Sequence, residues 1–178
     1  HCPFAEVAEC AAANSITFGA PTKTFNLAGV VSSYAIVPDA GLRQRFFDWL
    51  RARELNEPTV FAPIATIAAF RRGETWRREM LAYVEDNIRF VEAYCRDHLP
   101  AVRPVRPEAS FLVWLDCRRL GLNHEQLLDL FVDKAHLALN DGEMFGTGGA
   151  GFMRLNVGTP RAVLEQAMRQ LAEAIAQL

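Results

Sequence analysis

One long amphipathic segment constrains the fold of this chain more than any other pattern. Its large apolar residues recur at steps of three and four, which places them along one face of a helix: Trp76, Met80, Val84, Ile88, Val91 and Cys95. We expect this helix to end before Pro100, because the residue preceding a proline is biased away from helical geometry. A helix of this length divides the 178-residue chain, and we predict that it bridges two domains.

The residues before this helix predict short strands and two further helices. Strands are expected over Ser15 to Phe18 and Ser32 to Val37. Asp39 is placed to cap a helix, and Pro58 suits the first turn of another. The helix after Pro58 is expected to bury its apolar face, which consists of Phe61, Ile64, Ile67 and Ala68. Thr75 is expected to cap the long helix that follows.

The residues after Pro100 predict a small α+β domain. Strands are expected from Val102 and over Ser110 to Leu115, and Asn123 with Gln126 forms the pattern of a capping box. Thr159 and Pro160 then start a terminal helix. We therefore expect a first domain over 1–75, a bridging helix over 76–100 and the small domain over 101–178.

Composition excludes several classes of protein. A net charge of −2 and a pI near 6.1 give no electrostatic case for binding nucleic acid or an anionic membrane. No apolar run approaches the ~20 residues that span a bilayer. The four cysteines and four histidines match no metal or redox spacing. We predict no metal site and a reduced, cytoplasmic location.

Lys23 is the first candidate functional residue. It lies in the segment Ala20 to Gly29, between a strand-like run and a turn closed by glycine. A lysine amine at a rigid strand end, partly desolvated, can lose its proton and attack an aldehyde. The hydroxyl groups of Thr22 and Thr24 could donate to a phosphate. From these residues alone, a solvated turn lysine remains the alternative.

Arg154 is the second candidate. In the run Phe152 to Val157 it shares one strand face with Phe152 and Asn156, while the alternate residues are apolar. An arginine held on a strand presents a rigid fork suited to a carboxylate; a surface arginine paired with a local acid is the alternative. Arg161 would oppose a helix dipole, so we expect it to have a partner or to be solvated.

The glycine-rich segment before Arg154 is not expected to bind a dinucleotide. Gly146, Gly148 and Gly151 match the G-x-G-x-x-G pattern, but that fingerprint requires a strand before it and a helix directly after it. A strand-like run follows instead. We interpret the segment as a glycine loop.

Taken with Lys23, the segments Asn140 to Gly146 and Gly151 to Arg161 resemble a known family. They are similar to fold-type-I pyridoxal-phosphate enzymes of the class I/II aminotransferase superfamily, and within it to cystathionine β-lyases (carbon–sulfur lyases) of the MalY/PatB type. The resemblance spans nearly the whole chain. It implies an α/β to α+β chain with the aspartate aminotransferase-like fold of the pyridoxal-phosphate-dependent transferases, comprising the end of the large domain and the small α+β domain.

The resemblance also implies roles for three residues. Lys23 would hold pyridoxal 5'-phosphate as a Schiff base, Thr22 would contact the cofactor, and Arg154 would bind the substrate α-carboxylate across a shared cleft. An amino acid is the expected substrate and a homodimer the expected assembly. Relatives carry most of their cofactor contacts upstream of the lysine, so we expect this chain to be the C-terminal portion of an enzyme about twice as long. We expect no catalysis from the isolated chain.

Two positions bear on the reaction. Val31 stands where many aminotransferases of the superfamily carry a phosphate-binding arginine, which the lyase branch commonly lacks; Ala20 replaces a frequent phosphate-binding serine. The resemblance therefore favours a lyase that releases thiol, pyruvate and ammonia. An aminotransferase acting on a 2-oxo acid is the alternative, and a non-catalytic regulator that reuses this fold is a further one.

Overall fold

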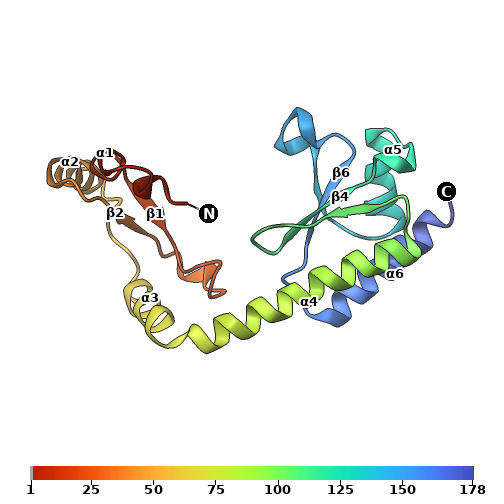
Figure 1. Cartoon of the computed structure of the whole chain (residues 1–178), viewed down its shortest axis with the longest axis horizontal. Helices are drawn as coiled ribbons and strands as arrows, with labels where there is room; N and C mark the ends of the chain where they lie inside the picture. The colour runs from red at the N-terminus through yellow and green to blue at the C-terminus, as the bar shows by residue number, and fades with distance from the viewer. Residues whose placement is uncertain (1) are drawn as a thin grey trace. The chain divides into compact units, whose positions relative to one another are not determined.

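The structure is a computed structural model that describes residues 2–178. His1, where the first expected domain starts, lies outside the described residues. The chain forms two compact units, one ending at Glu79 and the other beginning at Met80. The division falls inside α4 (Glu74–His98), the long helix coloured yellow-green to green in Figure 1.

The first unit contains two short strands and three helices before α4. β1 (Thr17–Gly19) pairs antiparallel with β2 (Tyr34–Ile36). As expected, the Asp39 side chain caps α2 (Ala40–Arg51) by accepting a hydrogen bond of 2.6 Å from the Leu42 amide. The remaining elements are the 3₁₀ turns η1 (Phe4–Glu6) and η2 (Ala28–Val30), and the helices α1 (Glu9–Ala13) and α3 (Phe61–Arg72).

Helix α3 departs from its prediction in two ways. It begins at Phe61, so Pro58 lies outside its first turn. The apolar face is exposed rather than buried, with Phe61 75%, Ile64 63% and Ile67 51% exposed. The periodicity identified the apolar face, but three of its four apolar residues remain more than half exposed in the structure. Only Gly73 separates α3 from α4, which begins at Glu74. Thr75 therefore lies inside α4 and does not cap it.

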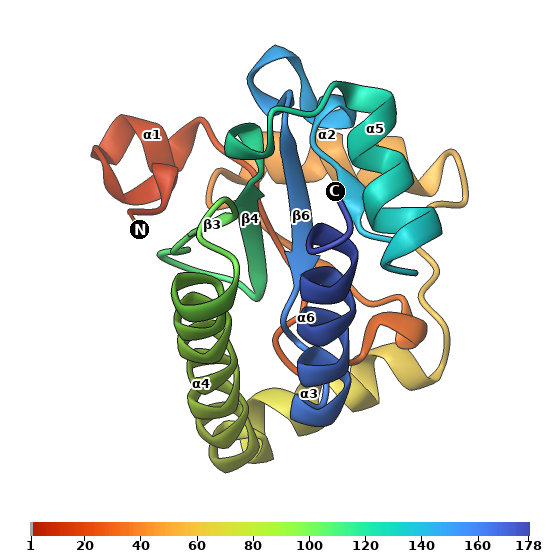
Figure 2. The same cartoon turned by 90° about the vertical axis from the view of Figure 1, so that its right-hand side faces the viewer.

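The second unit is an antiparallel sheet packed against helices. The strand order is β3 (Arg103–Val105), β4 (Leu112–Asp116), β6 (Phe152–Asn156) and β5 (Asn140–Asp141). Figure 2 shows α4 and α6 (Arg161–Ile175) running side by side. The other elements are η3 (Arg118–Leu120), α5 (His124–Asp129), the π-helical turn η4 (Leu130–Lys134), η5 (Glu143–Phe145) and η6 (Thr147–Gly149).

The core of this unit lies on one face of the sheet. Val113 and Leu115 of β4, with Met153 and Leu155 of β6, are buried in one cluster with apolar side chains of α4, α5 and α6. Alternate strand residues point to the other face, which carries Arg154. The strand face and the capping box of Asn123 with Gln126 are both confirmed.

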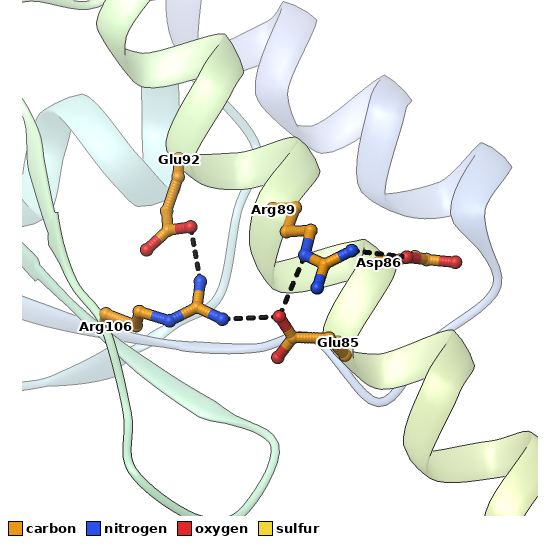
Figure 3. Close-up of polar contacts among 5 residues, drawn as sticks. All are labelled: Glu85, Asp86, Arg89, Glu92 and Arg106. Carbon is orange, nitrogen blue, oxygen red and sulfur yellow. Dashed lines mark hydrogen bonds and ion pairs between the residues drawn. The ribbon is translucent and has the colours of Figure 1, made fainter.

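A charged cluster joins α4 to the segment that follows β3. The Arg106 guanidinium donates to Glu92 at 2.6 Å and also to Glu85, which pairs with Arg89 on the same helix (Figure 3). The hydrogen bond from Arg106 is the main cause that lowers the pKa of the Glu85 carboxyl. The cluster holds the start of the β3–β4 connection against the helix.

Candidate functional site

The first candidate, Lys23, lies in a tight turn after β1. The Phe25 amide donates to the Pro21 carbonyl at 2.9 Å, and the Leu27 amide donates to the Thr22 carbonyl at 2.8 Å. Asn26 adopts a φ of 53°, a left-handed conformation that asparagine tolerates better than most residues. These bonds fix the backbone on both sides of the lysine.

The Lys23 side chain is exposed, as in the solvated alternative and not the partly desolvated one. No hydrogen bond or ion pair joins its ammonium to another side chain among residues 2–178 of the structure. Lys23 borders a hollow of about 350 Å³ together with the small and hydroxyl residues Ala20, Thr22, Ala28, Val31, Ser32 and Ser33. The amine is therefore accessible and lies beside several hydroxyl groups.

An aromatic anchor holds the lysine turn against the junction of α3 and α4. The Phe25 ring lies 5.5 Å from the Phe70 ring, edge to face, and 6.3 Å from the Trp76 ring. A Cβ at Gly73 would lie only 2.7 Å from the Phe25 ring. Glycine at this junction thus permits the close approach of Phe25.

Val31 and Ser32 also line this hollow. Val31 has a φ of 52°, which is unfavourable for a β-branched residue. The next residue, Ser32, shares a 2.6 Å hydrogen bond with the Thr66 hydroxyl of α3. This bond ties the wall of the hollow to the helix that also contacts Phe25.

The second candidate, Arg154, is held on β6 by two neighbours that sequence reasoning did not single out. Its Nη2 donates to Asn140 Oδ1 at 2.7 Å, and its guanidinium carbon lies 4.4 Å from the centre of the Phe145 ring. Asn140 is the direct cross-strand partner of Arg154. The register could not be read from the sequence, because β5 is only two residues long.

One donor of Arg154 has no partner. Its Nε is buried and makes no hydrogen bond to residues 2–178. Arg154 also borders a hollow of about 360 Å³ with Asn140, Asn156 and Thr159. A buried donor without a partner costs free energy, so this guanidinium retains a capacity for an acceptor such as a carboxylate.

Asn87, which sequence reasoning also missed, fixes the end of the Arg154 strand. Its amide donates to the carbonyls of Val157 at 2.8 Å and Thr159 at 2.9 Å, and its oxygen accepts from Arg161 Nε at 2.9 Å. Asn87 is fully buried. Arg161 also lies over the Phe90 ring, so of the two expected outcomes, a partner or a solvated position, the structure shows a partner.

The remaining sequence candidates have structural explanations. The glycine segment leads into strand β6 and not into a helix, as expected. Cys95 and Cys117 are buried free thiols, and burial raises the pKa of each to about 12. In residues 2–178 no group of His, Cys, Asp and Glu side chains could hold a metal ion. None of the described helices is long and apolar enough to cross a membrane.

The structure places Lys23 and Thr22 in the first unit and Arg154 in the second. Lys23 presents an accessible amine next to residues that carry hydroxyl groups. Arg154 presents a guanidinium whose Nε has no partner among the described residues. The first arrangement suits covalent capture of a carbonyl compound, and the second suits binding of a carboxylate.

Comparison with known proteins gives relatives over nearly the whole chain. No protein-family model matches. The chain is 38% identical over 175 residues to the cystathionine beta-lyase PatB of Bacillus subtilis, covering 98% of the chain and 45% of PatB. It is 31% identical over 155 residues to the protein MalY of Escherichia coli, covering 86% of the chain and 40% of MalY.

A solved structure agrees with these relatives. A pyridoxal-phosphate-bound protein from Clostridium difficile 630 is 38% identical, with a TM-score of 0.94 over 98% of this chain and 45% of the other. The chain thus spans about 45% of the length of PatB and of this protein. The expected fold is confirmed.

Proposed function

Because the chain is homologous to the cystathionine beta-lyase PatB and to MalY, we propose that the full-length protein is a pyridoxal-phosphate-dependent carbon–sulfur β-lyase. It would act on sulfur-containing amino acids and release thiol, pyruvate and ammonia. The observation that carries the proposal is this homology over nearly the whole chain, together with an accessible lysine in the turn after β1.

The residues present fit the cofactor. Lys23 supplies a primary amine without an ion-pair partner among the described residues, and the hydroxyl groups of Thr22 and Ser33 border the same hollow. An amine and nearby hydroxyl donors match a ligand that carries an aldehyde and a phosphate. We propose that Lys23 binds pyridoxal phosphate covalently and that Thr22 contacts it.

The proposed mechanism divides the work between the two candidates. Arg154, which borders a hollow, binds the α-carboxylate of the amino acid through its guanidinium. Lys23, once its amine is free, accepts the α-proton. The bound cofactor supplies an electron sink for the pair left on the α-carbon. We propose that Lys23 and Arg154 act on the same substrate molecule in the full-length protein.

Two further properties belong to this proposal. A homodimer is supported by the resemblance to the class I/II aminotransferase superfamily. A cytoplasmic location is supported by four cysteines that are all free thiols. Besides the cofactor, the proposed mechanism requires an amino-acid substrate as a small-molecule partner.

The test uses the two lysines of this chain as target and matched control. Borohydride reduction of the full-length protein with pyridoxal phosphate should attach the cofactor to Lys23 and not to Lys134, which pairs with Asp129 at 3.0 Å. Peptide mass spectrometry locates the modification. Lys23→Ala should abolish pyruvate release from cystathionine, whereas Lys134→Ala should retain it.

The reaction type is tested in the same preparation. Pyruvate formed from cystathionine without any 2-oxo acid supports the lyase. Amino transfer to a 2-oxo acid without thiol release would replace it with an aminotransferase. Labelling of Lys134 alone, or no labelling, would refute the role of Lys23.

A further inference from the structure

His124, the first residue of α5, lies between two carboxylates. Its Nε2 is 3.4 Å from Asp141 Oδ2, and its Nδ1 is 3.3 Å from Glu143 Oε1. Asp141 ends β5 and Glu143 begins η5. One imidazole ring therefore connects α5 to both sides of Gly142.

The two bridged residues lie between the two neighbours of Arg154. Asn140 directly precedes Asp141, and Phe145 lies shortly after Glu143. Asn140 accepts a hydrogen bond of 2.7 Å from Arg154 Nη2, and the Phe145 ring lies 4.4 Å from the guanidinium carbon. A displacement of the segment 140–145 would thus move both groups that orient the guanidinium.

Hydrogen bonds to the backbone hold the same segment. The Gly142 amide donates to the Phe152 carbonyl at 2.9 Å, and the Phe145 amide donates to the Gly142 carbonyl at 3.0 Å. The Glu143 amide donates to Asp141 Oδ1 at 3.0 Å. These bonds keep their donors and acceptors between about pH 5 and 8, the range in which a histidine changes its charge.

The protonation state of His124 decides how many carboxylates it can hold. A neutral imidazole has one N–H group, whereas the imidazolium donates from both nitrogens. Because each ring nitrogen faces a carboxylate oxygen, the bridge is complete only in the imidazolium. All three side chains are partly exposed, and an exposed ion pair shifts an equilibrium by up to about fivefold.

The other charged groups near the ring do not replace this bridge. Glu125 and Asp129 lie on α5 itself, and the adjacent η4 carries Asp133 and Lys134. The Lys134 ammonium pairs with Asp129 at 3.0 Å. Protonation of His124 therefore adds a positive charge among acidic groups.

We propose that His124 is a positioning residue for Arg154. Its protonated imidazole holds the segment 140–145, and through Asn140 and Phe145 it holds the guanidinium, so that protonation of His124 strengthens binding of an amino-acid carboxylate. The proposal rests on the proposed function, because it takes Arg154 as the carboxylate site.

Hydrogen–deuterium exchange tests whether the bridge holds the segment. The hydrogen-bonded amides of Gly142, Glu143 and Phe145 report its opening, and mass spectrometry of peptides from the full-length protein loaded with pyridoxal phosphate follows them. After correction for the intrinsic rate, we expect exchange to be about threefold slower at about pH 6 than at about pH 8.

His124→Gln should abolish this difference between the two pH values. His98→Gln is the matched control and should keep it, because His98 is an exposed histidine on α4 whose ring packs against Tyr94. A difference that persists in His124→Gln would overturn the proposal and leave the proposed function intact.

Calorimetry with L-alanine, which has no leaving group on its β-carbon, tests the effect on binding. The ratio of the dissociation constants of His124→Gln and wild type cancels the titration of ligand and cofactor, which both proteins share. We expect a ratio of about three at about pH 6 and of about one at about pH 8. A ratio that does not change with pH would overturn the proposal.

A second variant leaves the imidazole in place. Asp141→Asn combined with Glu143→Gln removes both negative charges, and the new amide oxygen at position 141 can still accept from the amide of residue 143. The pH dependence of the exchange should disappear, and its persistence would show that the bridge is not its cause. L-Alanine binding that is unaffected by Arg154→Ala, or no binding at all, would overturn both proposals.

Discussion

At the scale of single residues, Asn87 links three parts of the second unit. One buried amide group on α4 bonds two backbone carbonyls and the Arg161 side chain. Both carbonyls lie just after β6, so Asn87 fixes the end of the strand that carries Arg154. Removing its side chain would leave these carbonyl groups without their donor.

Asn87→Ala is expected to destabilise the protein by about 2–4 kcal/mol. A buried polar group left unsatisfied costs about 1–3 kcal/mol, and this substitution removes the partner of two carbonyls and of the Arg161 side chain. Urea unfolding followed by circular dichroism measures the change. Asp86→Ala is the matched control on the neighbouring position, with a side chain 66% exposed, and should change stability by less than about 0.5 kcal/mol. Equal losses in both variants would contradict the role of Asn87.

The positions of residues that belong to a local sequence pattern could be predicted. The alternation around Arg154 predicted its strand face correctly. Asn87, Asn140 and Phe145 were missed because their partners are distant or depend on strand register. The turn residues left open whether Lys23 is partly desolvated or solvated, since this depends on what packs around the turn; the structure has it exposed.

At the scale of elements, Arg106 connects the β3–β4 segment to α4 (Figure 3). Its hydrogen bond lowers the pKa of Glu85 in the folded protein. A carboxyl with a lowered folded pKa adds stability above its unfolded pKa, and this stability is lost as pH falls through the folded pKa.

Arg106→Ala should therefore lower the urea midpoint at pH 7 and low salt, and the difference from wild type should shrink in acid. It should also shrink near 1 M salt, where exposed charges are screened. Arg96→Ala is the control, because among residues 2–178 Arg96 forms an ion pair only with the adjacent Asp97 on the same helix. A loss in Arg106→Ala that ignores both pH and salt would mean that packing, not charge, holds the segment.

The start of a helix could be predicted where the sequence contains a complete capping motif. Asn123 and Gln126 form a complete local motif, and the structure contains the predicted capping box. Pro58 and Thr75 carry weaker signals, and neither starts a helix. The apolar face of α3 was recognised by its spacing, but spacing does not reveal whether another element covers it.

At the scale of the whole molecule, the apolar core is unevenly distributed. Every member of the main buried cluster lies between Val84 and Ala174. Before Met80, the buried residues among those described are only Ala11, Pro21, Val37 and Ala62. Burial of apolar surface is the main driving force of folding, so the two units should differ in autonomy.

A fragment of residues 74–178, which keeps α4 whole, should unfold cooperatively on heating. A fragment of residues 1–79 should show no cooperative transition and should bind the dye ANS, which reports exposed apolar surface. Far-UV circular dichroism and dye fluorescence measure both properties. A sharp thermal transition in the fragment 1–79 would show that a small core suffices.

The fold was predictable at this scale because Lys23 and the Arg154 segment occur in a characteristic order, and the solved relative matches over 98% of the chain. The domain limits 1–75, 76–100 and 101–178 remain a proposal. A common role of Lys23 and Arg154 stays a proposal, because the contacts that fix each residue lie within its own unit.

The two carbonyls held by Asn87 flank a single residue, Gly158. One amide group can reach both only while the linker keeps this spacing. An insertion or a deletion between Val157 and Thr159 would detach one carbonyl and shift the start of α6. The length of this linker is thus set by a side chain 70 residues earlier in the chain.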